Sequence, residues 1–474
     1  MASSLRQVVM LGKRAWKKTN IISLGRKLSV SSKRQLLSES YACDNAWRKH
    51  LQDAHLNQVN MSDFGYEIRD RLEMSGTVSA VDMNVLVHQL NNMDDDEADF
   101  MEDLLARFNM CQSSLPHNDS TSHAIVRGFL AKRQDGSARL VRLLSQPLQY
   151  GLFPDHYSLN LLLDKLLDSG DFARASRVAY HTMLQEELGL SPVHTLLCLQ
   201  AAVARLTQGP VSDLALPPPE KPDEEEEEDW IKVKYIKFPV YDDHFDIKDE
   251  RFLLGKTLHM LAQVQDLSIP KEMATSLSVI GFGIHHKFSQ GLAVLEAALK
   301  SSTGSVSQQA LNLFSDSLEN VEARDPEEPE VEIALRMVDD VIHRLLPTTK
   351  EKDEFQRRLG QLKEQLLSQG KVQVDFNLGS AVSAFVKSEL PKYEQSDIEN
   401  QVKRFSHWEE ERNNELVRQV EDLKKSERIE EIKKQVMELQ EQEELLSYFD
   451  SEEKIRLTML EEDLAKDENL TIAK

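Results

Sequence analysis

The fold of this chain is decided by residues 148–192, LQYGLFPDHYSLNLLLDKLLDSGDFARASRVAYHTMLQEELGLSP. Gly170 can adopt the left-handed conformation that ends a helix, and Asp171 can cap the N-terminus of the next helix. The pattern therefore predicts a hairpin of two short helices, which needs stacked neighbours to bury its apolar faces. The apolar residues at helical spacing are Leu159, Leu162, Leu163 and Leu166, then Phe172, Ala175, Val178, Ala179 and Met183.

The same pattern occurs upstream at an offset of 37 residues, and more faintly 40 residues before that. The small alanine and the helix lengths recur together with the apolar positions, which is typical of an α-solenoid. We therefore predict an all-α fold, an α-solenoid of helical hairpins followed by a long charged C-terminal helix resembling a coiled coil. The matching positions are Ile125, Val126, Phe129, Ala138 and Val141 in the first copy, and Val85, Leu86, Leu90, Ala98 and Met101 in the fainter one.

The hairpin resembles a pentatricopeptide repeat. In that family one base of single-stranded RNA can be read per repeat by two or three side chains. The resemblance implies reading positions at His123 and Asp155 for the first repeat and at Asn160 for the second, and these three residues are our candidates for RNA contact. For His123 and Asn160 the alternative is that they are ordinary exposed residues of a helix. The resemblance rests on Pro154–Asp155, Ser158–Leu159–Asn160, Asp164, Gly170 and Ala175, and the second repeat departs from it by closing with Ser191–Pro192–Val193.

Composition limits the classes of function. A net charge of -23 argues against a nonspecific nucleic-acid binder, because phosphate contacts need Lys and Arg. The three cysteines lie far apart and predict reduced thiols, with neither a disulfide framework nor a metal motif. The chain has no run of 18 apolar residues, so we expect no membrane insertion. No nucleophile, base and orienting group occur together, so we predict no enzyme, no catalytic residue, no cofactor and no metal.

Two motifs in the second half of the chain are rejected as ligand sites. Gly255–Lys256–Thr257 resembles the end of a phosphate loop, but the loop requires glycine at position 250, which is Glu250. The group Gly281, Gly283, His285 and His286 suggests a metal site, yet no further ligand stands at helical spacing. We expect a turn between solenoid helices there.

The N-terminus is basic and contains no acid before Glu39, while nine Lys and Arg residues lie among residues 1–38. This acid-poor, amphipathic composition predicts a mitochondrial transit peptide. The rival interpretation is a basic arm that binds nucleic acid. The sharp change of composition near residue 38 favours the transit peptide.

The rest of the chain divides by composition. An amphipathic segment at 378–390 should end before Pro391, and the stretch from Ser396 to about Leu446, free of Pro and Gly, predicts one long helix. The expected parts are a transit peptide at 1–38, helical repeats at 39–208, an acidic and Pro-rich linker at 209–229, further helical repeats at 230–300, a linker at 301–330, a helical segment at 331–395, and the long charged helix and tail at 396–474.

In the order of its parts the chain resembles the pentatricopeptide-type proteins of the mitochondrial small ribosomal subunit. The resemblance implies a structural, matrix-located component of that subunit in mitochondrial translation. Its expected partners are the ribosomal RNA and neighbouring mitochondrial ribosomal proteins, the latter through the C-terminal helix. The heptads break between Leu423 and Ile432, so we expect docking on a larger body and not a homo-oligomer. The alternative function is a free mitochondrial pentatricopeptide factor for RNA processing or translation.

Overall fold

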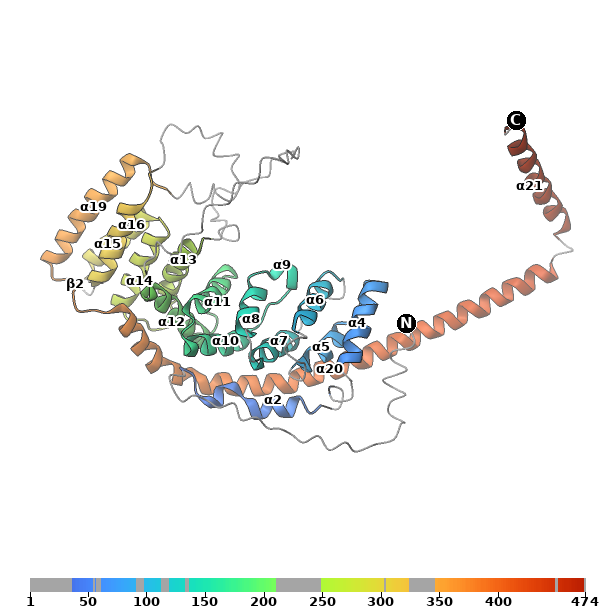
Figure 1. Cartoon of the computed structure of the whole chain (residues 1–474), viewed down its shortest axis with the longest axis horizontal. Coiled ribbons are helices and arrows are strands. Elements are labelled where there is room, and N and C mark those ends of the chain that lie inside the picture. The colour runs from blue at the N-terminus through green and yellow to red at the C-terminus, as the bar shows by residue number, and fades with distance from the viewer. Residues whose placement is uncertain are drawn as a thin grey trace. The chain divides into compact units, whose positions relative to one another are not determined.

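The computed structural model describes residues 36–472, apart from 54–55, 57–60, 91–97, 112–118, 133–135, 210–248, 302–303, 324–345 and 448–450. The described residues belong to two compact units. The larger, called the solenoid unit below, ends at His407, and the smaller, called the helical extension, begins at Trp408 (Figure 1). Two predicted segments, the transit peptide and the acidic linker, lie largely outside the described residues, and so does the first part of the predicted helical segment, residues 331–345.

The solenoid unit is a row of helices packed side by side, which confirms the predicted all-α solenoid (Figure 1). Its one described pair of strands is parallel and only two residues long, with Val306 opposite Val372. In chain order the elements are η2 (Glu39–Ala42), α2 (Asp44–His50), α4 (Met61–Ser75), α5 (Ala80–His88), α6 (Ala98–Asn109), α7 (Asp119–Ala131), α8 (Gly136–Leu144), α9 (Pro147–Tyr150), α10 (His156–Ser169), α11 (Phe172–Leu184), α12 (Pro192–Gln208), α13 (Glu250–Gln263), α14 (Lys271–Ile284), α15 (Phe288–Lys300), β1 (Val306–Ser307), α16 (Gln308–Asn320), α19 (Thr349–Ser368), β2 (Val372–Gln373) and the first part of α20 (Leu378–Leu446).

The predicted hairpin is formed by α10 and α11. The Asp155 carboxylate accepts the N–H of Ser158 at 3.1 Å and begins α10, while Gly170 ends it with a left-handed φ of 76°. Asp171 then caps α11 through the N–H of Arg174 at 3.1 Å. The helix α10 begins 37 residues after α7, as the offset predicts, and packs on α7, α11 and α12. The buried apolar faces of these helices make the core of the solenoid.

Helices α13 and α14 cross at two glycines. A Cβ on Gly255 would lie 2.7 Å from the backbone N of His285, and one on Gly281 would lie 2.7 Å from the carbonyl O of Gly255. Gly255 belongs to the interior of α13, which agrees with rejecting a phosphate loop. The turn expected between solenoid helices is present at His285 and His286, just after α14 ends, whereas Gly281 itself lies inside that helix. Absence of side chains is what lets the two backbones approach.

Two segment predictions need correction. The predicted linker at 301–330 contains β1 and the helix α16, whose Phe314 is fully buried. Pro391 does not end a helix but lies within α20. A proline inside a helix costs about 3 kcal/mol. That cost is offset because the buried face continues on both sides of the proline: Leu378, Val382, Val386 and Leu390 before it, then Gln401 and Phe405 after it.

The part of α20 within the solenoid unit runs back along the repeats, opposite to the chain order of the helices it crosses. The N–H of Leu378 donates to Gln309 of α16 at 3.4 Å, and the Ser383 hydroxyl donates to Gln200 of α12 at 3.1 Å. Further along, Arg404 forms ion pairs at the N-terminal ends of α10 and α7. Figure 1 shows α2 and the early part of α20 along one side of the helix row.

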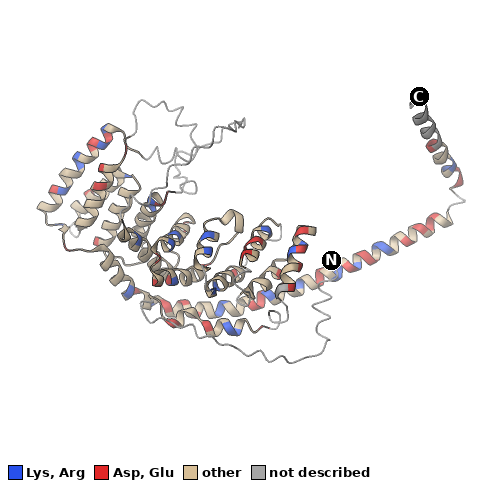
Figure 2. Cartoon of the chain, in the orientation of Figure 1, with Lys and Arg blue, Asp and Glu red and all other residues tan. Residues whose placement is uncertain are grey.

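The helical extension contains the rest of α20 and α21 (Glu452–Ile472). Lysines and arginines are interspersed with aspartates and glutamates along this part of α20, so its surface carries charges of both signs (Figure 2). Every residue from Lys424 to Leu446 is exposed, including the apolar ones. None of the helices in the described part of the chain combines the length and hydropathy that crossing a membrane requires.

Candidate functional site

The three predicted RNA-contact residues lie at one edge of the solenoid unit, where α7 and α10 begin. Two segments distant in sequence cover this edge: residues 36–51, and the stretch of α20 from Glu394 to Phe405. We call these two segments the cover. The N–H groups of Leu36 and Leu37 donate to the Asp164 carboxylate, each at 3.2 Å. The cover is therefore attached directly to the predicted pentatricopeptide hairpin.

His123 is 0% exposed and is held by hydrogen bonds at both ring nitrogens. Arg127 donates from Nε to His123 Nε2 at 2.9 Å, which makes Nδ1 the protonated nitrogen, and Nδ1 lies 2.6 Å from the Ser158 hydroxyl. The same arginine binds the Asp44 carboxylate at 3.1 Å and the carbonyl of Ala42, both within the cover. Burial and the neighbouring Arg127 charge hold the pKa of His123 well below its ordinary value.

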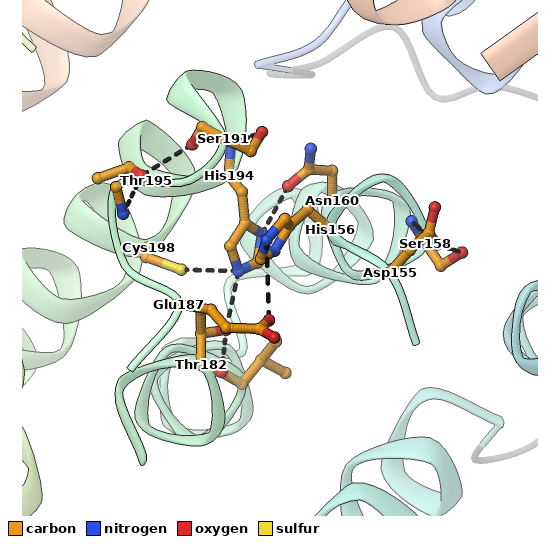
Figure 3. Close-up of polar contacts among 12 residues, drawn as sticks. Asp155, His156, Ser158, Asn160, Thr182, Glu187, Ser191, His194, Thr195 and Cys198 are labelled. Atoms are coloured by element: carbon orange, nitrogen blue, oxygen red, sulfur yellow. Dashed lines mark hydrogen bonds and ion pairs between the residues drawn. The ribbon is translucent and has the colours of Figure 1, made fainter. Parts of the chain in front are cut away.

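Asn160, also 0% exposed, is the centre of a second network (Figure 3). Its amide donates to the Tyr41 hydroxyl at 2.8 Å, and its carbonyl accepts from His194 Nδ1 at 2.7 Å. The Tyr41 hydroxyl donates in turn to the Asp397 carboxylate. On the other side, His194 Nε2 lies 2.8 Å from the Thr182 hydroxyl. Burial lowers the pKa of His194 to about 3, so this ring is neutral in the network.

Both carboxylate oxygens of Asp155 accept hydrogen bonds from other residues of the chain. One caps α10, and the other accepts Arg404 Nη1 of the cover at 2.5 Å, leaving the side chain 8% exposed. Arg404 also binds Asp119, in the first turn of α7, at 2.9 Å. One guanidinium therefore joins the beginnings of two neighbouring helices to α20. Each of its two terminal nitrogens donates a charge-assisted hydrogen bond to a different carboxylate.

Aromatic rings fill the space beneath these polar contacts. The Trp47 ring lies 5.1 Å from His123 and 5.6 Å from Phe405, measured between centroids, so both parts of the cover meet over the first repeat. Tyr41 stacks on Tyr157 at 4.9 Å, and the Tyr157 hydroxyl donates to the Tyr41 carbonyl. Such pairs add about 0.5–1.5 kcal/mol each beyond the burial of their area. The cover is thus an apolar as well as a polar contact.

The structure brings the three predicted residues together, at the starts of neighbouring helices. Each of them, however, is already bound to other side chains of the protein. The alternative of ordinary exposed helix residues is wrong for His123 and Asn160, because both are fully buried. RNA contact through the three stays a prediction, and it requires the cover to leave. Sequence reasoning missed Tyr41 and Arg404. The Tyr41 hydroxyl binds Asn160, 119 residues away, and Arg404 binds Asp155, 249 residues away, beyond any local periodicity.

The geometry gives no support to catalysis in this region. Cys198 Sγ lies 3.4 Å from His194 Nε2, which is the spacing of a nucleophile and its base (Figure 3). However, burial raises the pKa of the Cys198 thiol, so the reactive thiolate is disfavoured. The described residues contain no group of three or more His, Cys, Asp or Glu side chains arranged to hold a metal ion.

One known protein family matches nearly the whole chain. The sequence profile described as "Mitochondrial 28S ribosomal protein S27" aligns with residues 5–438. The matched range includes the repeat hairpin, the covered edge and α20 up to eight residues before its end. The chain therefore belongs to the mitochondrial 28S ribosomal protein S27 family, which makes it a component of the small ribosomal subunit in the mitochondrial matrix.

Proposed function

We propose that the chain is a structural, non-enzymatic component that contacts ribosomal RNA and neighbouring proteins of the small subunit. The observation that carries the proposal is the helical extension. Its α20 segment exposes apolar side chains among charges of both signs, and a free soluble chain gains nothing from exposing them. The exposed apolar residues are Val417, Ile429, Ile432, Val436, Met437, Leu439, Leu445 and Leu446.

The extension supplies the protein contacts. Ile429, Ile432, Val436 and Leu439 follow one another at steps of three or four residues, so they share one helix face. Changing these four to glutamine should release the protein from the subunit, because only the apolar stripe is lost while helix propensity is kept. A matched variant that replaces the two lysines of the sequence Lys433–Lys434 with glutamine removes charge from the same helix and should still assemble.

The RNA contacts are local. A net charge of -23 leaves little general attraction to phosphate, so the isolated protein should bind RNA weakly and with a clear salt dependence. For His123, Asp155 and Asn160 we propose contact only after the cover opens. Tyr41→Phe removes the hydroxyl that links Asn160 to Asp397, so it should strengthen binding of a single-stranded oligonucleotide if those positions bind RNA. Unchanged binding in this variant would exclude RNA contact through these three residues.

Sedimentation of mitochondrial lysate tests the proposal as a whole. The endogenous protein should migrate with the small subunit at near-unit stoichiometry and leave it after RNase treatment breaks the particle. A protein found only in light fractions, with intact small subunits in cells that lack it, would refute the structural role. Tight binding of one free RNA sequence would then support a free processing or translation factor.

A further inference from the structure

A cavity lies between the cover and the beginnings of three solenoid helices, and the contacts described above do not fill it. Its volume is about 560 Å³, which is within the range of ligand pockets. The walls come from the starts of α7, α10 and α12, from the turn after α11, and from α20, all within the solenoid unit. The residues used in the argument are Asp119, Asp155, Glu187, Asp397, Gln401 and Arg404.

Gln401 gives the first indication of a ligand. Its side chain lines the cavity and is 1% exposed, yet neither its amide nitrogen nor its amide oxygen has a hydrogen-bond partner among the described residues. Burying an unpaired amide destabilises a fold, and native proteins pair nearly all such groups. The NH₂ group of the amide donates and its carbonyl oxygen accepts, so the two match the carbonyl and the N–H of a peptide group.

Charge gives the second indication. Four carboxylates line the cavity, those of Asp119, Asp155, Glu187 and Asp397, against the single guanidinium of Arg404. The three helix starts carry about half a positive charge each, which together offset fewer than two of the carboxylates. The cavity therefore stays negative and disfavours phosphate. Burial and the neighbouring Asp155 charge raise the pKa of Asp397, as expected where acids outnumber bases.

We propose that this cavity binds an arginine side chain of a basic protein segment, with Gln401 pairing to the peptide backbone of that segment. Guanidinium groups form fork-shaped hydrogen bonds with carboxylates. Asp119 and Glu187 are the two more accessible acids, 44% and 41% exposed, and only Glu187 is not already bound to Arg404. A divalent cation fits less well, because the amide donor of Gln401 would remain unpaired. The proposal deepens and rests on the proposed structural function, since it names the chemistry of a partner.

The test uses the full-length chain and a fluorescent pentapeptide, Gly-Ser-Arg-Ser-Gly with an amidated end, followed by anisotropy. A citrulline peptide of the same shape removes only the charge, and uridine monophosphate and magnesium chloride serve as competitors. The variants are Glu187→Gln, Gln401→Leu and, as the matched control outside the cavity, Glu364→Gln on the exposed side of α19. Thermal melting of every variant accompanies the titrations.

The arginine peptide should bind about tenfold more tightly than the citrulline peptide, since one charge-assisted pair is lost. Both cavity variants should weaken binding and the control should not. Gln401→Leu should melt at or above the wild-type temperature, because no hydrogen bond is removed. No arginine binding, equal binding of the citrulline peptide, displacement by the nucleotide or the metal salt, or a lower melting temperature for Gln401→Leu would each overturn the proposal. Such a failure would leave the sedimentation result untouched.

Discussion

Replacing Gly255 with alanine should force α13 and α14 apart. The new Cβ would lie 2.7 Å from the His285 nitrogen and 2.8 Å from the Gly281 carbonyl oxygen, where ordinary contact begins at 3.4 Å. Both atoms belong to the backbone and cannot rotate away, so the helices must separate locally by about 0.7 Å. Leu254, Leu258 and other fully buried neighbours would lose contacts in the same movement.

Two opposing effects set the magnitude. Overpacking a tight core costs about 1–3 kcal/mol, while alanine is favoured over glycine inside a helix by about 1 kcal/mol. We therefore expect Gly255→Ala to lower the free energy of unfolding by up to about 2 kcal/mol. Gly360→Ala is the matched control, because Gly360 lies inside α19 and nothing is within 4 Å of its Cβ position. The control should be stabilised by up to about 1 kcal/mol.

Urea unfolding followed by helical circular dichroism measures both variants. The double variant Gly255→Ala with Gly281→Ala should cost less than the sum of its parts, because one separation of the helices serves both methyl groups. The reasoning is refuted if Gly255→Ala is as stable as the Gly360→Ala control. It is equally refuted if the two substitutions at the crossing add without coupling.

Three further predictions follow from other parts of the solenoid unit. Leu162→Asp places an unpaired charge at a fully buried position and should cost several kcal/mol, visible as a lower melting temperature; an unchanged melt would contradict the repeat register. Burial raises the pKa of Asp164 from 3.8 to about 6, so the folded state holds the proton more tightly than the unfolded state. Stability should therefore fall as pH rises from about 4 to 6, and Asp164→Asn should flatten that fall in urea midpoints at pH 4.5 and 7.5. The transit peptide should be cleaved before Leu36, because Leu36 and Leu37 bind Asp164; N-terminal sequencing that finds a start beyond Leu37 would contradict this.

Local signals predicted the repeats, and long-range contacts decided the rest. Helical spacing and caps such as Gly170 and Asp171 act over a few residues, so the sequence alone placed the hairpin. Pro391 misled the prediction because a proline is read as a helix end, whereas here packing along the whole buried face of α20 outweighs its local cost. Tyr41 and Asp397, which form a hydrogen bond, are 356 residues apart, and a partner so distant cannot be predicted from either residue type.

The cover changes how the solenoid unit is expected to fold. In a simple solenoid each repeat touches only its neighbours, so the array can unfold piece by piece. The contact of the segment around Tyr41 with the far end of the unit adds a closure of very high contact order, which is slow to form and ties distant repeats into one cooperative transition. Because a chain emerges N-terminus first, residues 36–51 are the only part of the cover available to the first repeats until α20 has been made and can close over them.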